Sequence, residues 1–119
     1  MKMKKFLILI SVLATLASSN VFAFGAIAVD DEEGETEPGY GFVTGEDNKD
    51  TARSEALKEC KKAGGENCKV VVWFKQCGAY AASKKYYGYG YGSNKGKAIA
   101  DALEMCGQKS CKIAIAECE

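Results

Sequence analysis

Short apolar segments of strand character alternate along the chain with segments of helical periodicity. Residues 24–29 and 39–44 are apolar or glycine-rich and favour β-strands. Between residues 52 and 60, small and apolar residues recur every three or four positions, which is the spacing of one helix face. Residues 68–75 are apolar on both faces, so we expect a strand there that lies in the centre of a sheet.

The same order of elements then occurs a second time. CGAYAA repeats the pattern of FGAIAV, and GYGY at residues 88–91 matches GYGF at residues 39–42. A second helical stripe and a second apolar strand follow. The sequence therefore predicts an α+β fold with two ββαβ repeats, residues 24–76 and 77–119, in which antiparallel sheet is covered by two helices.

The first 23 residues have the composition of a signal peptide. Basic MKMKK precedes an apolar run at residues 6–17, and Val21 and Ala23 are small residues at the positions that signal peptidase reads. The apolar run is too short to cross a bilayer as a helix. We expect cleavage after Ala23 and a secreted or periplasmic bacterial protein with no membrane span, in which residues 24–119 form a single domain.

Removal of the signal peptide makes the protein weakly acidic. The signal carries three of the 16 basic residues, so the mature chain has 13 basic against 16 acidic residues and a net charge of about −3. Nucleic-acid-binding proteins present basic surfaces to phosphates. We therefore expect no nucleic-acid partner.

All of the cysteines belong to the repeated helix-strand segments. Six cysteines in a small exported domain indicate three disulfides, and their spacing is not that of a zinc site. Alternation along each strand puts Cys68 and Cys111 on the faces that meet their own helices, and the two closing cysteines on the opposite face. The predicted pairs are Cys60–Cys68 and Cys106–Cys111 within the repeats and Cys77–Cys118 between them, with no metal site.

The sequence lacks the residues and motifs of the common enzyme classes. It contains no histidine and no G-x-S-x-G motif, so the usual general base and serine nucleophile are missing. We expect no catalytic residue and no cofactor. The acidic run Asp30–Glu37 is typical of a solvated loop. One alternative is a small hydrolase in which a carboxylate of this loop meets Asp101, Glu104 or Glu117 in a cleft.

Aromatic residues form the most suggestive pattern. Tyr87, Tyr89 and Tyr91 share one face of a strand, and Tyr40 and Phe42 of the first repeat extend it. The intervening glycines form the other face, which allows a helix or another backbone to approach closely. Such an aromatic face suits sugar rings or a protein surface, or it fills the core against the helices.

The function we expect is a non-enzymatic exported binding module, similar to an effector or an inhibitor. Its partner would be a protein or a cell-envelope glycan, held by the aromatic strand face. A passive structural component of the envelope is the other alternative.

Several segments together identify a resemblance. FGAIA follows directly after the export signal, and GYGF, ALKEC, CKVVVWFKQCGAYA, ALEMC and CKIAIAEC succeed it. This pattern resembles the bacterial secreted family known as domain of unknown function 4189, over residues 24–118. The resemblance implies an exported, cysteine-containing module, and some relatives are considered host-directed secreted proteins. The family offers no established catalytic residues.

Overall fold

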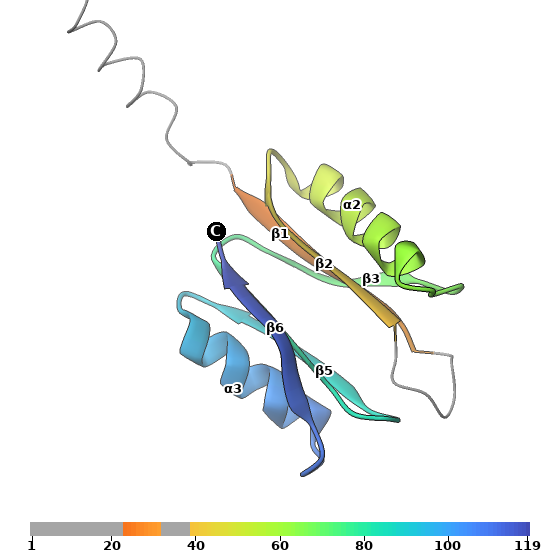
Figure 1. Cartoon of the computed structure of the whole chain (residues 1–119). Coiled ribbons are helices and arrows are strands. Elements are labelled where there is room, and N and C mark those ends of the chain that lie inside the picture. Colours follow the sequence, from red (N-terminus) through yellow and green to blue (C-terminus); the bar gives the residue numbers. More distant parts are fainter. Residues whose placement is uncertain (1–22, 32–38) are drawn as a thin grey trace, which may run out of the picture.

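Two ββαβ units pack together, each consisting of a three-stranded antiparallel sheet with one helix on its outer face (Figure 1). The computed structural model describes residues 23–31 and 39–119, so the predicted signal peptide, apart from its last residue, lies outside the described residues. The first unit contains β1 (Phe24–Asp30), β2 (Gly39–Glu46), α2 (Lys49–Lys62) and β3 (Lys69–Phe74). The second unit contains β4 (Cys77–Ala82), β5 (Tyr87–Gly92), α3 (Lys95–Cys106) and β6 (Lys112–Cys118).

The first strand of each unit is the central strand of its sheet. The strand orders are β2-β1-β3 and β5-β4-β6, and every described pair is antiparallel. The prediction that residues 68–75 form a central strand is therefore wrong, because β3 lies at the edge of its sheet. Its two faces are both apolar for another reason: Val70 packs on α2, whereas Val72 and Phe74 pack on the second sheet.

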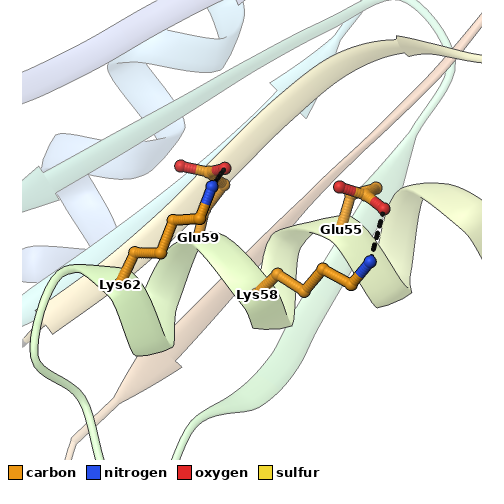
Figure 2. Close-up of polar contacts among 4 residues, drawn as sticks. All are labelled: Glu55, Lys58, Glu59 and Lys62. Carbon is orange, nitrogen blue, oxygen red and sulfur yellow. Dashed lines mark hydrogen bonds and ion pairs between the residues drawn. The ribbon is translucent and has the colours of Figure 1, made fainter.

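Both helices begin at an asparagine that satisfies a free amide of the first turn. The side-chain oxygens of Asn48 and Asn94 each accept a hydrogen bond, from Thr51 N and Lys97 N, at 2.8 Å. The outer face of α2 carries two ion pairs, Glu55–Lys58 and Glu59–Lys62 (Figure 2). Both pairs are exposed, so each contributes a few tenths of a kcal/mol at most to stability, about 0.2–0.5.

Small residues allow each helix to lie directly on its sheet. Alanines of the central strands meet alanines of the helices, and the glycines of the outer strands lie beneath the helix backbone. A Cβ at Gly41 would overlap main-chain atoms of Ala56 and Cys60, and one at Gly88 would overlap those of Ala102 and Cys106. The prediction of a glycine face that a helix can approach is therefore confirmed.

The positions of these glycines also correct the alignment of the repeats. Gly41 and Gly88 occupy the same place under their helices, and Ile27 pairs with Phe42 as Tyr80 pairs with Tyr89. Tyr40-Gly41-Phe42 is thus equivalent to Tyr87-Gly88-Tyr89. The match of GYGF to GYGY that the sequence suggested is displaced by two residues, because alternating glycine and aromatic residues align equally well in either position.

The two sheets pack face to face, so the helices form the outer layers (Figure 1). Strand β1 lies against β4, β2 against β6 and β3 against β5. Ile27, Val29, Tyr80 and Ala82 fill the space between the central strands. The buried ring of Phe74 lies against both Gly25 of β1 and Gly78 of β4, and a Cβ at either glycine would overlap it.

A β-bulge in each unit breaks the simple alternation of faces. The β1–β3 register passes from Ile27↔Val72 to Ala28↔Val70, so Val71 is an extra residue. Ala114 is the corresponding extra residue of β6, which brings Cys118 to the same face as its register partner Cys77. A one-residue insertion moves every later side chain to the opposite face.

The three disulfides are Cys60–Cys68, Cys106–Cys111 and Cys77–Cys118, the same pairs that the sequence predicted. However, Cys77–Cys118 joins β4 to β6 inside the second unit, so its placement between the repeats was wrong. The bulge is the reason, since the prediction assumed uninterrupted alternation. No free cysteine occurs in the described residues, which is compatible with an extracellular or periplasmic protein. Within residues 23–31 and 39–119, no helix is both long and apolar enough to cross a membrane.

We expect Gly88→Ala to lower the free energy of unfolding by about 2 kcal/mol, because the added methyl group must displace the backbone of α3. Urea unfolding of the oxidised protein measures the change. Gly96→Ala is the matched control, since that glycine lies in α3 with only Asn94 Oδ1 near its Cβ position. The control should be neutral or more stable than wild type. Equal stability of the two variants would contradict the close helix-sheet contact.

Candidate functional site

The structure separates the five aromatic residues that the sequence predicted as a binding face. Tyr40, Phe42, Tyr87 and Tyr89 are half-buried and pack into the core between the two sheets. Tyr91 is 54% exposed. The inner faces of the two sheets cover each other, so the five rings do not form one continuous exposed surface.

Three tyrosines form a stack that crosses the interface between the units. The rings of Tyr40 and Tyr87, which are equivalent residues of β2 and β5, lie on either side of Tyr80, at centroid distances of 4.3 and 6.1 Å. The Tyr87 hydroxyl donates to Asp31 Oδ2 at 3.3 Å, and Lys69 Nζ lies 3.5 Å from the same oxygen. Stacked aromatic pairs stabilise beyond the area that they bury. These tyrosines therefore hold the two units together.

Two exposed aromatic residues, Trp73 and Tyr91, lie instead at one edge of the first sheet, and a third, Tyr86, lies in the turn between β4 and β5. An open groove of about 510 Å³ lies between β3 and the end of β5. Tyr91 lines it from β5, and Trp73, which is 38% exposed, lines it from β3. The remaining lining residues are Val71, Val72, Phe74, Lys75, Gln76 and Gly92. We call this hollow the β3 groove.

The two exposed aromatic residues of the β3 groove, Trp73 and Tyr91, flank the edge of β3 from opposite sides. Trp73 is the register partner of Ala26, which faces α2, so Trp73 lies on the helix side of the first sheet. Tyr91 is the register partner of Gly78, which faces Phe74, so Tyr91 lies on the side between the sheets. In the described chain β3 pairs only with β1, which leaves its outer edge open. An extended segment placed there would run between the two rings.

Two lysines surround the indole of Trp73 and the neighbouring phenyl ring. Lys49 Nζ lies 5.1 Å from the centroid of Trp73, and Lys75 Nζ lies 5.7 Å from that of Phe24. The rings of Phe24 and Trp73 are 6.0 Å apart. A cation is attracted to the face of an aromatic ring, so each lysine helps to hold the ring beneath it in place. Trp73 was not predicted as a candidate site residue, because the residues beside it in the strand, Val72 and Phe74, are apolar and indicated only burial.

No carboxylate of the described residues lines either of two grooves in the structure. Asp30, assigned above to a solvated loop, is 1% exposed, and its Oδ2 accepts hydrogen bonds from Glu66 N and Asn67 N at 2.8 and 3.1 Å. It has a structural role in the first unit. Asp101 pairs with Lys97 Nζ at 2.8 Å on the surface of α3. Among the described residues, no cluster of three or more potential metal ligands occurs. Residues 32–37 of the acidic run lie outside the described residues.

Burial raises the pKa of the Tyr87 phenol above its ordinary value of 10.0, and the charge of Asp31 and the hydrogen bond to it add to the effect. The folded protein thus holds this proton more tightly than the unfolded chain. The resulting contribution to stability is present below pH 10 and is lost as the pH rises above this value.

We expect Asp31→Asn to lower the pKa of Tyr87 toward, but not fully to, its ordinary value, because burial remains the largest cause. The ultraviolet absorbance of tyrosinate, followed against pH, measures this shift. Tyr87→Phe identifies the signal, since it should remove the component that titrates above pH 10. A titration curve that Asp31→Asn leaves unchanged would contradict the contact between the units.

Comparison with known proteins gives one match. Searches of curated proteins and of solved structures found no significant similarity. The family model described as "Domain of unknown function (DUF4189)" matches residues 24–118, which comprise all eight described strands and helices from β1 to β6. The chain therefore belongs to the family of domain of unknown function 4189.

Proposed function

We propose that this protein is a non-enzymatic exported binding module that pairs with an extended segment of a partner protein along β3. The observation that carries this proposal is the open edge of β3 between Trp73 and Tyr91. Main-chain groups of an edge strand supply hydrogen bonds to any extended peptide, and flanking side chains select its sequence. Inhibitors and effectors that act on other proteins belong to this class.

The shape of the β3 groove favours a protein partner over a glycan. Six of its eight lining residues are consecutive, residues 71–76, so the groove follows the direction of one strand. The rings of Trp73 and Tyr91 lie on opposite sides of that strand, and they do not form a single flat platform for a sugar ring. The bulge at Val71 interrupts the pairing register, which makes residues 72–76 the segment available to an added strand.

An exported location supports this function. The predicted signal peptide at residues 1–23 would deliver the chain to the periplasm or outside a bacterial cell, where its three disulfides are stable. A preformed, cross-linked groove binds with a smaller loss of conformational entropy than a flexible one.

The two alternatives receive less support. A carboxylate-dependent hydrolase requires two acids in one cleft, and the β3 groove has no acidic lining residue. A passive envelope component does not require exposed aromatic rings such as Tyr91 and Trp73. Large apolar side chains at an edge are a liability for aggregation unless a partner covers them.

We expect the oxidised mature protein, immobilised on beads, to enrich extended peptides from a random peptide library displayed on phage. A selected synthetic peptide should shift the amide NMR signals of residues 72–76, because its main chain pairs with theirs. Tyr91→Ser and Trp73→Ser should each weaken binding of this peptide by about tenfold, which corresponds to the loss of one buried aromatic contact.

The matched control is Met105→Ser, which removes an apolar side chain of similar exposure from α3, outside the β3 groove. This variant should bind the peptide as wild type does. Insoluble peptidoglycan is sedimented with the same proteins in parallel. Binding to peptidoglycan that depends on Tyr91, without peptide binding, would overturn the protein partner in favour of a glycan. Peptide binding that is indifferent to both rings would overturn the β3 groove as the site.

A further inference from the structure

A second hollow, of about 760 Å³, lies in the second unit and has a different chemical character. It is bounded by the turn between β4 and β5 and by the start of β6. Its polar lining residues are Ser83, Lys84, Lys85, Tyr86, Ser110 and Lys112. Three lysines line it and no acidic residue does. We call it the basic pocket.

In the first unit, a buried carboxylate occupies the equivalent place. At the end of β1, the buried carboxylate of Asp30 accepts hydrogen bonds from the amides of Glu66 and Asn67. These amides belong to the turn that leads through Cys68 into β3. The carboxylate thereby fixes that turn against the end of the central strand, and its two hydrogen bonds are of the charge-assisted, stronger kind.

Register pairs define the equivalent positions in the second unit. Val29 pairs with Lys69 in the first sheet, and Ala82 pairs with Lys112 in the second. The residue that follows each central strand is Asp30 in one unit and Ser83 in the other. Counting back from the paired lysines, Asn67 corresponds to Ser110 and Glu66 to Lys109. Both turns are tied to their helix by a disulfide, Cys60–Cys68 and Cys106–Cys111.

The second unit therefore lacks the carboxylate at this place and has a pocket instead. Ser83 is only 7% exposed and lines the basic pocket. Its amide donates to Tyr86 O at 2.9 Å, which closes the turn between β4 and β5. A serine hydroxyl can donate a hydrogen bond to a carboxylate that enters the pocket.

We propose that the basic pocket binds an acidic side chain of a peptide, whose carboxylate takes the place that Asp30 fills in the first unit. Lys84, Lys85 and Lys112 supply the opposite charge, and the Ser83 hydroxyl, which lines the pocket, supplies a hydrogen-bond donor. The occupant in the first unit is itself an aspartate on a polypeptide, so an acidic peptide is the chemical class that the fold already accommodates. The exposed ring of Tyr86 contacts the apolar part of this ligand. This site is separate from the β3 groove and does not depend on the function proposed for it.

The test is an NMR titration of the oxidised mature protein with two peptides, acetyl-Gly-Asp-Gly-amide and acetyl-Gly-Asn-Gly-amide. The aspartate peptide should give saturable shifts of the amide signals of Ser83, Lys109, Ser110 and Lys112. The asparagine peptide has the same shape without the charge, and it should give none. Saturable shifts of equal size with both peptides, or none with either, would overturn the proposal.

Two variants of Ser83, whose new side chains have the same shape as each other, test whether the basic pocket is the binding site. Ser83→Asp supplies an internal carboxylate, as in the first unit, and should weaken binding of the aspartate peptide by about tenfold or more relative to Ser83→Asn. If Ser83→Asp does not fold, the exposed pair Lys84→Glu and Lys85→Glu reverses two charges without touching the core and should give the same loss. Binding that persists in these variants would overturn the basic pocket as the site. Shifts of the same amides by polygalacturonate, without shifts by the aspartate peptide, would overturn the peptide as the ligand class.

Discussion

The contact of one aromatic ring with two glycines determines how the two units join. The side chain of Phe74, in the edge strand β3, extends between the sheets and lies against Gly25 and Gly78, one in each central strand. No other residue type at these two positions leaves room for the ring. The equivalent residue in the second unit is Glu117, since Gly78 pairs with Glu117 as Gly25 pairs with Phe74. Phe74 thus has no aromatic counterpart in the second unit, and the two repeats differ at this point although their folds match.

This interface also determines which surfaces remain for binding. The sheets lie face to face with a helix on each outer face (Figure 1). Tyr40, Phe42, Tyr87 and Tyr89 therefore pack between the sheets, whereas Tyr91 stays exposed. What remains accessible is the edge of each sheet and the turns at its end. The two units have diverged in these places: the first has an aromatic edge at β3 and a turn filled by Asp30, and the second has a basic pocket where Ser83 replaces that aspartate. The two units thus share one scaffold, and their edges differ in chemistry.

The sequence predicted the repeated ββαβ order, the helices, the glycine faces and the disulfides Cys60–Cys68 and Cys106–Cys111, because each depends on local spacing. It also predicted the pair Cys77–Cys118, but assigned this disulfide to the contact between the repeats. It did not predict that β1 and β4 are central, since strand order depends on pairing between distant segments. It also missed the bulges at Val71 and Ala114, which no residue type marks. The sequence showed aromatic residues at alternate positions of the strand. This alternation is the same whether the aromatic face packs against a second sheet or binds a ligand, so the sequence did not distinguish the two. Trp73 and the lysines of the basic pocket become candidate site residues only through their neighbours in space.

The most direct test of this structure is a nuclear Overhauser measurement on the oxidised mature protein. If Phe74 closes the interface, its ring protons should show cross-peaks to the α-protons of both Gly25 and Gly78. The first glycine belongs to the same sheet as Phe74, whereas the second belongs to the other unit, so only the second contact reports on the packing of the two sheets. Cross-peaks to Gly25 alone would show that the sheets do not meet at this ring, and they would contradict the account of how the aromatic residues are divided between the interior and the binding edge.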